Sequence, residues 1–337
     1  MTIKDLAKET GYSVGTISRV LNNQPNVSQK ARDAILAIVH ERGFQLNTNA
    51  KTLKQQRSNC IAAVVKGTAN EMFASLVEQL QALFAATEHP LIVDFIDEDA
   101  NEVKRAVQLC AERKPMGLMF LGATNTYFEQ DFARIAVPTV VVTNDASRLP
   151  FENLSSVTTD DRKGAACAVE YLLRAGHKDV AVLGGDRSLS DTSALRYEGC
   201  LEAYARCGMA FDEPRLYHTG RYSYASGYQA MQAVLRDTPE VTAVFAMADV
   251  IAIGAIRAAC DAGLRVPEDI SVVGYDGLAI GGYYCPKLTT ITQSLDRLAQ
   301  RSFEILMACV ENGAPAKHIT VPFTLSCRES VRNLAKE

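Results

Sequence analysis

Residues 2–22, TIKDLAKETGYSVGTISRVLN, are the stretch on which the interpretation of this chain depends. Apolar side chains recur at helical spacing on either side of Gly11: Ile3, Leu6 and Ala7 before it, and Ile17, Val20 and Leu21 after it. Thr2 and Ser13 stand where the N-caps of two short helices belong. Two short helices joined by a tight turn form a helix-turn-helix, whose second helix can lie in the major groove of DNA.

The second of these helices has an outward face that could contact DNA. Its outward positions are Val14, Gly15, Thr16, Ser18 and Arg19. Arg19 is the long donor among them and can reach a guanine edge with two hydrogen bonds. A small helical hairpin that only packs against the rest of the chain has the same pattern, so residues 2–22 by themselves leave both interpretations open.

Charge is distributed unevenly along the 337 residues. Residues 1–57 hold nine Lys and Arg against four Asp and Glu, a net charge of +5. Residues 58–337 have a net charge of −9, so the whole chain has a net charge of −4. A basic head on an acidic body suits a protein that contacts the phosphate backbone at one end only. A merely solvated basic surface is the alternative.

The segment after the helix-turn-helix completes a small domain and then becomes a linker. Ser28 is the expected N-cap of a third helix with an apolar stripe (Ala31, Ile35, Ile38 and Val39), and Gly43 is its expected end. We therefore expect a helix-turn-helix DNA-binding domain over residues 1–46 and a hinge or linker over residues 47–58.

The polar, cationic linker contains one large apolar residue, Leu53, which stands between Lys51 and Lys54. Such a segment is either a plain linker or a short helix that inserts its leucine between base steps in the minor groove. Composition alone favours the plain linker.

From Cys60 onward, strand-length apolar runs alternate with helical patterns. The runs are at 60–65, 91–96, 117–121, 139–143, 180–183, 243–246 and 270–273. Nearly continuous apolar strands separated by helices predict parallel sheets covered on both faces. The series breaks near 148–154 and then repeats, which predicts two doubly wound lobes with a ligand cleft between them.

Composition excludes several classes of protein. With 47 % apolar and 22 % charged residues, and no apolar run of membrane-spanning length, the chain is expected to be cytoplasmic. The nine cysteines are scattered without a CxxC pair, so we expect neither a metal nor another cofactor. Dispersed histidines and an incomplete glycine motif at 184–186 indicate no catalytic constellation, and we do not expect an enzyme.

The assembled pattern resembles the lactose-repressor (LacI/GalR) family of bacterial transcription regulators across essentially the whole chain. The stretches that carry the resemblance, besides residues 2–22, are AKTL (50–53), DDRKG (160–164), GHKDV (176–180), RYEG (196–199), AMADVIAIGA (246–255), GLRVPED (263–269), VGYD (273–276) and LTTI (288–291). The resemblance implies an all-α helix-turn-helix head and a two-lobed α/β body with two doubly wound parallel sheets, like a periplasmic binding protein. The implied effector-binding and dimerisation domain is 59–337, with an N-lobe of about 59–157 and 291–318 and a C-lobe of about 158–290 and 319–337.

For the head, the resemblance implies a homodimer that reads a pseudo-palindromic operator on double-stranded DNA. Val14, Gly15 and Arg19 then occupy base-reading positions, and Leu53 occupies the position that intercalates at the operator centre, which reverses the preference from composition. Lys51 and Lys54 would flank it in the minor groove. The chain departs from the family pattern at Leu46, where a proline is usual, and at Lys51, where an arginine is usual.

For the body, the resemblance implies a small-molecule effector in the cleft. The implied contact residues are Phe73, Asn144, Thr192, Arg196, Tyr222 and Asp276. Without the resemblance, the two aromatic residues read as core and Arg196 with Asp276 as a structural ion pair. Ala248 replaces an asparagine that many sugar-binding members carry, and Ser190 replaces an arginine of purine-responsive members. A carbohydrate or related polar metabolite is the expected effector.

Two alternatives to an effector-controlled regulator are open at this stage. A protein corepressor could control the regulator and leave the cleft vestigial. A solute-binding protein would share the two-lobed body, but it would not need residues 1–57.

Overall fold

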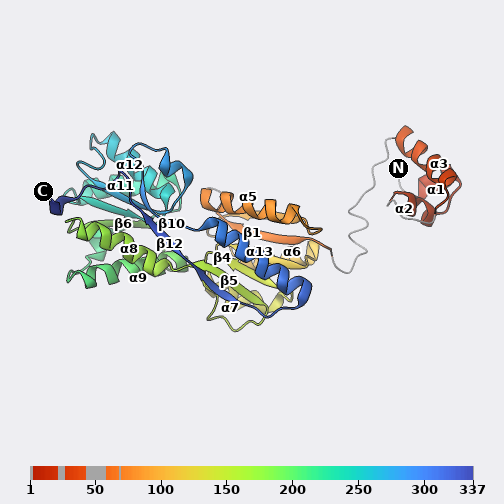
Figure 1. The fold of residues 1–337 in the computed structure, drawn as a ribbon, viewed down its shortest axis with the longest axis horizontal. Coiled ribbons are helices and arrows are strands. Elements are labelled where there is room, and N and C mark those ends of the chain that lie inside the picture. Colours follow the sequence, from red (N-terminus) through yellow and green to blue (C-terminus); the bar gives the residue numbers. More distant parts are fainter. Residues whose placement is uncertain (1–2, 22–26, 43–57, 68–69, 337) are drawn as a thin grey trace. The chain divides into compact units, whose positions relative to one another are not determined.

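A computed structural model describes residues 3–21, 27–42, 58–67 and 70–336 (Figure 1). The chain divides into two compact units, Met1–Arg57 and Ser58–Glu337, and each is described here by itself. The predicted minor-groove residues Lys51, Leu53 and Lys54 lie outside the described residues, as do the expected N-cap Thr2 and the expected helix end at Gly43.

The first unit contains the predicted helix-turn-helix and a third helix. Its elements are α1 (Ile3–Thr10), α2 (Val14–Leu21) and α3 (Gln29–Glu41). Leu6, Ile17, Val20 and Ile35 are buried together and form the core that holds the three helices. The hydroxyl of Ser13 accepts a hydrogen bond from the Thr16 amide at 3.1 Å, and that of Ser28 accepts one from the Ala31 amide, so both serine N-caps are confirmed.

The second unit is built on two six-stranded sheets. The first has the order β11-β5-β4-β3-β1-β2, formed by His318–Val321, Leu154–Thr159, Thr139–Val142, Gly117–Leu121, Ile61–Lys66 and Leu91–Ile96. The second has the order β12-β10-β9-β8-β6-β7, formed by Phe323–Ser326, Thr289–Gln293, Ser271–Asp276, Ala243–Ala246, Val180–Gly184 and Tyr217–Thr219. All neighbouring strands pair in parallel except β10 and β12.

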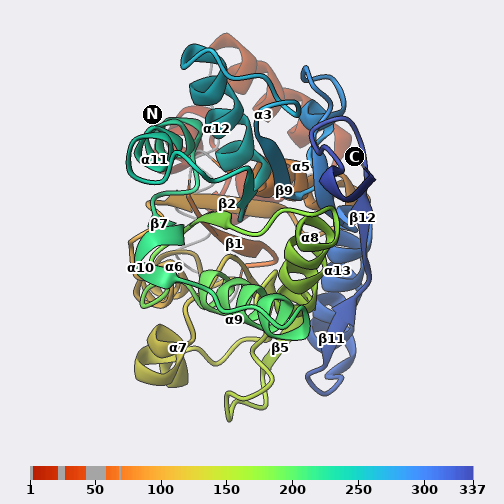
Figure 2. The same ribbon diagram turned by 90° about the vertical axis from the view of Figure 1, so that its left-hand side faces the viewer.

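Helices cover both faces of each sheet, which explains why the strands are apolar on both sides. On the first sheet, one core contains α5 (Glu71–Ala85) and α13 (Leu295–Asn312), and the other contains α6 (Glu102–Arg113) and α7 (Asn125–Asp131). Figures 1 and 2 show α8 (Asp161–Arg174) and α9 (Asp191–Arg206) on one face of the second sheet. On its other face lie α11 (Tyr224–Asp237) and α12 (Asp249–Asp261). The short helices are α10 (Glu213–Leu216), η1 (Phe132–Arg134), η2 (Ala279–Gly282) and η3 (Leu334–Lys336).

The backbone passes between the two lobes three times. It crosses after β5 near Asp160, after β10 near Ser294 and between β11 and β12 near Pro322. Each crossing lies slightly later in the chain than the boundary expected from the sequence, because β5, β10 and β11 each belong to one sheet along their whole length. The predicted class, a helix-turn-helix head with a body of two doubly wound lobes, is confirmed.

Five of the described strands have no counterpart among the seven apolar runs, namely β5, β7, β10, β11 and β12. β5 reads LSSVTT and is buried along its whole length, but its serine and threonine side chains hide it from a search for apolar runs. Among the described helices, none combines the length and the hydropathy needed to cross a membrane.

Candidate functional site

The exposed face of α2 is the first candidate site. Val14, Gly15 and Arg19 are exposed, and Val14 keeps 46 % of its surface open although it is apolar. Thr16 and Ser18 are partly buried, and the Thr16 hydroxyl lies 2.9 Å from that of Ser13 within the N-cap. An exposed face of small and apolar groups with one arginine can enter a major groove without displacing the core of the unit.

The second candidate site is a cavity of about 500 Å³ between the two lobes. It lies beyond the carboxyl ends of strands from both sheets, where parallel α/β folds bind their ligands. All six residues predicted to contact an effector line this cavity: Phe73, Asn144, Thr192, Arg196, Tyr222 and Asp276. The structure therefore brings together side chains that lie as far apart in the sequence as Phe73 and Asp276.

Arg196 lies on the C-lobe side of the cavity and has several internal partners. Its Nε donates to Asp161 at 2.8 Å, another nitrogen donates to the Met247 carbonyl, and Nη2 lies 3.9 Å from Asp276. The guanidinium carbon also lies 3.6 Å from the Tyr275 ring centroid. Burial lowers the pKa of Arg196, but the Asp161 carboxylate and the other acidic neighbours raise it by more, so the side chain stays charged.

Close packing of two helices makes the Arg196–Asp161 pair possible. α8 carries Asp161 at its first position, and α9 carries Arg196. Gly199 allows the approach, because a Cβ at this position would lie 2.1 Å from the carbonyl oxygen of Arg162. The Arg-Tyr-Glu-Gly stretch thus supplies both the cation, Arg196, and the glycine, Gly199, that lets α9 pack close enough to α8 for the ion pair to form.

Asp276 ends β9 in a strained backbone conformation, with φ at +119°. Gln293 donates to its carboxylate at 2.9 Å. Burial raises the pKa of Asp276 to about 7, although Arg196 opposes the rise. Behind it, Asp249 accepts hydrogen bonds from the Thr290 hydroxyl and the Leu278 amide, both at 2.6 Å, and burial together with Asp276 raises its pKa to about 8. Asp249 therefore holds the turn that positions Asp276.

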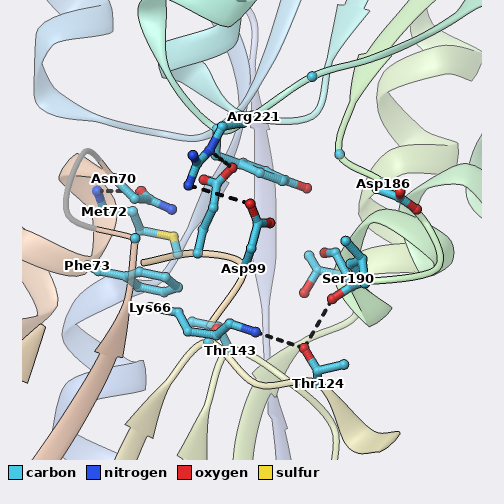
Figure 3. A pocket seen from close by; sticks show the side chains of 18 of the residues that line it. Lys66, Asn70, Met72, Phe73, Asp99, Thr124, Thr143, Asp186, Ser190 and Arg221 are labelled. Carbon is cyan, nitrogen blue, oxygen red and sulfur yellow. Dashed lines mark hydrogen bonds and ion pairs between the residues drawn. The ribbon is translucent and has the colours of Figure 1, made fainter. Parts of the chain in front are cut away.

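The N-lobe side of the cavity contains a cation that the sequence analysis missed. Lys66 ends β1, and its ammonium lies 2.9 Å from the Thr124 hydroxyl (Figure 3). The same ammonium lies 3.0 Å from Glu102. Glu102 is fully buried at the start of α6, and its other oxygen accepts a hydrogen bond from the Thr124 amide at 2.6 Å. Burial raises the pKa of Glu102, and the Lys66 ammonium opposes that rise. The sequence signal that could have identified Lys66 is its position directly after five apolar strand residues.

Direct hydrogen bonds join the two lobes beside the cavity. Asn144 donates to the Thr192 hydroxyl at 3.1 Å, so two predicted effector residues contact each other. The Thr124 hydroxyl, already bonded to Lys66, donates to the Leu189 carbonyl at 3.1 Å. Phe73 is 8 % exposed and contributes an apolar wall. This side of the cavity thus combines a polar rim with one aromatic surface.

A second feature missed from sequence is an exposed ionic latch at the cavity mouth, formed by Arg221 of the C-lobe with Asp97, Glu98 and Asp99 of the N-lobe. Arg221 contacts Asp97 at 2.7 Å and Glu98 at 2.5 Å. It also lies 3.8 Å from Asp99, as Figure 3 shows for the labelled pair. These side chains come from loops that follow β2 and β7, and no local pattern in the sequence links the two loops.

The chemistry of the cavity is that of recognition. Tyr222 and Ser193 share a 2.8 Å hydrogen bond on the C-lobe wall, and burial raises the pKa of Tyr222 above its usual value. Within the described ranges, no group of three or more His, Cys, Asp and Glu could hold a metal ion. Hydroxyl, amide, guanidinium and ammonium donors next to an aromatic wall suit a small polar ligand.

Comparison with known families gives two matches that follow the two units. The model for "Bacterial regulatory proteins, lacI family" matches residues 2–47. The model for a "Periplasmic binding protein-like domain" matches residues 169–331.

Relatives and solved structures match over nearly the whole length. The chain is 33 % identical to the HTH-type transcriptional regulator MalR of Clostridium butyricum, over 99 % of this chain and all of that protein. A lac repressor dimer bound to operator and the anti-inducer ONPF is 28 % identical, with a TM-score of 0.77, and covers 98 % of this chain and 99 % of that one. A complex of the transcriptional regulator CelR with cellobiose is 26 % identical, with a TM-score of 0.73 and the same coverage.

These matches confirm the resemblance drawn from the motifs, and they favour a transcription regulator over an enzyme or a solute-binding protein. The chain belongs to the lacI family of bacterial regulatory proteins.

Proposed function

We propose that this regulator represses transcription as a homodimer that binds a pseudo-palindromic operator. In each chain, α2 would lie in the major groove, with Val14, Gly15 and Arg19 at base edges and Thr16 and Ser18 nearer the backbone. Leu53 would insert into the minor groove at the operator centre, with Lys51 and Lys54 beside it. The exposed face of α2 is the observation that supports this assignment. Such a regulator works in the cytoplasm, where the chromosome lies.

A small polar molecule in the interlobe cavity would control operator affinity. The observation that carries this proposal is that all six predicted contact residues line one cavity of about 500 Å³. The structural relative that contains cellobiose supports a carbohydrate as the effector. A ligand that favours one arrangement of the lobes shifts the population of that arrangement, and operator affinity changes by linkage.

We also propose the division of labour along the chain: DNA binding by residues 1–46, a hinge at 47–58, and effector binding with dimerisation by 59–337. The three backbone crossings near Asp160, Ser294 and Pro322 would be the axis about which the lobes rotate.

Selection of bound fragments from a random DNA pool tests the DNA-binding proposal. We expect an enriched sequence with two inverted half-sites, and Leu53→Ala should weaken binding to it by a few kcal/mol because a wedge that stabilises bent DNA is lost. A chain that stays monomeric and enriches no sequence would contradict the proposal.

Calorimetry against a panel of sugars tests the effector proposal. Arg196→Ala should abolish the effector response, while the unliganded protein should still bind the selected operator. A response that appears only with a protein fraction of a cell extract would instead support a protein corepressor.

A further inference from the structure

The cavity is lined by three cationic side chains, and each of them has an acidic partner. Lys66 is paired with Glu102 at 3.0 Å, and Arg196 with Asp161 at 2.8 Å. Arg221 forms the latch with the three acids that follow β2. Within the part of the chain that the structure describes, none of these three cations is left to neutralise an anionic ligand.

Acidic groups without a cation of their own also line the cavity. Asp186 is exposed, and hydrogen bonds from the Ser188 hydroxyl and amide lower its pKa, so it is ionised. At the mouth, Glu98 and Asp99 share Arg221 with Asp97. A negatively charged ligand would therefore approach an acidic rim and lose its hydration without gaining a free cation.

The Lys66–Glu102 pair differs from an ordinary surface ion pair. Both side chains are at least nine-tenths buried; the ammonium lies 3.0 Å from Glu102 as an ion pair and donates one N–H to the Thr124 hydroxyl. An ammonium has three N–H donors, so one is available to an oxygen atom in the cavity. Glu102 lies behind Lys66 and cancels its charge, so the subsite offers a hydrogen-bond donor without offering a net positive charge.

We propose that Lys66 and Glu102 form a specificity-determining subsite that selects an uncharged polyhydroxyl effector and rejects its anionic counterpart. Lys66 donates to a hydroxyl or ring oxygen of the ligand, and Glu102 removes the preference for carboxylate or phosphate. The proposal rests on the effector role of the cavity and adds the charge class of the effector. The Lys66 ammonium has donors only, so a protonated amine in place of that hydroxyl finds no acceptor on it, and an amino sugar is rejected as well.

The full-length protein is tested by calorimetry against matched sets in which only the charge differs. The sets are glucose, glucuronate and glucosamine; galactose, galacturonate and galactosamine; and cellobiose with cellobionate. We expect binding by at least one neutral member, and weakening of about 10- to 100-fold or loss with its charged counterparts, because a charge that loses its hydration without gaining a partner lowers the binding free energy. Tighter binding by a charged member, or binding by no neutral member, overturns the proposal.

Two variants locate the selectivity in the subsite. Lys66→Met should weaken the neutral sugar about 10- to 100-fold. Glu102→Gln leaves the ammonium uncompensated, so it should reverse the ranking and give measurable binding of the uronate. The control is Glu329→Gln, which removes the acid of an exposed Lys287–Glu329 pair at 3.1 Å and should leave the ranking unchanged.

The outcomes remain informative if a variant does not fold, because the matched sets on the unmodified protein already test the charge class. A Glu102→Gln protein that folds and still prefers the neutral sugar overturns the role of the pair. Operator selection without any ligand is measured in parallel. If operator binding is present and the charge ranking fails, the proposed subsite is wrong while the proposed DNA-binding function stands.

Discussion

The recognition helix and the interlobe cavity use their polar groups in opposite ways. On α2, the candidate DNA contacts stand on an exposed face above a small core, and Arg19 is open to solvent. In the cavity, the principal cations are buried and already paired, as Arg196 is with Asp161 and Lys66 with Glu102. A surface that meets a polyanion must keep its donors free, whereas a cavity that closes on a small molecule must satisfy its charges before the ligand arrives. Substitutions should therefore affect binding in the first region, and both stability and binding in the second.

The largest expected effect is on the cavity side. Asp161→Asn leaves the buried Arg196 guanidinium without its 2.8 Å partner. The free energy of unfolding of the body should fall by about 3–5 kcal/mol, as when one member of a buried ion pair is removed. Urea unfolding followed by circular dichroism measures this loss. A loss no larger than that caused by Arg257→Gln, which breaks an exposed pair on α12, would contradict the comparison.

A pH dependence should also come from the cavity side. Burial raises the pKa of Asp249 to about 8 and that of Asp276 to about 7, so the folded chain holds these protons more tightly than the unfolded chain does. Their contribution to stability is full below the usual carboxyl pKa and is lost as the pH rises through 7 and 8. Asp249 alone should account for a loss of about 2 kcal/mol between pH 6 and pH 8.

The Asp249→Asn variant tests that assignment. It should unfold with a smaller loss of stability between pH 6 and pH 8 than the unmodified chain. Identical pH profiles of the two proteins would show that a group other than Asp249 is responsible for the pH dependence of stability.

On the head, Arg19→Ala should weaken operator binding by about 1–3 kcal/mol and relax the preference at one base pair of each half-site. The stability of the body should not change, because Arg19 belongs to the other unit. Competition assays with single-base operator variants measure the preference. An unchanged profile would mean that Arg19 contacts phosphate instead of a base.

The smallest effect is expected at the exposed latch. Arg221→Ala should leave stability nearly unchanged, because exposed ion pairs contribute little. It should, however, remove part of the salt dependence of effector affinity, since the latch joins the lobes at the mouth. Equal salt dependence in the variant and the unmodified chain would exclude a role for the latch in closure.

Local patterns were sufficient to predict much of this molecule. Helical spacing and serine N-caps predicted α2 and α3. Apolar runs predicted most of the strands, because helices cover both faces of each sheet. The strand β5 could not be found this way, because its two buried serine hydroxyls have partners far along the chain: Ser155 accepts from the Lys317 amide, and Ser156 contacts His318. Polar residues that are satisfied only by tertiary contacts look like a loop in the sequence.

Prediction of the cavity from the sequence was limited in the same way. The resemblance named six residues that do line it, but it did not name Lys66, Glu102 or Arg221. The partners of these three are 36 or more positions away, or on the opposite lobe, so no spacing rule connects them. Their pairing follows from how the strand ends meet, which is a property of the folded chain.

The three crossings of the backbone between the lobes have a consequence for cleavage. A protease cut at Asp160, Ser294 or Pro322 alone leaves two intact connections, so the two halves of the body cannot drift apart after one cut. A chain cut at one crossing should therefore keep its two lobes together, because the other two connections still join them.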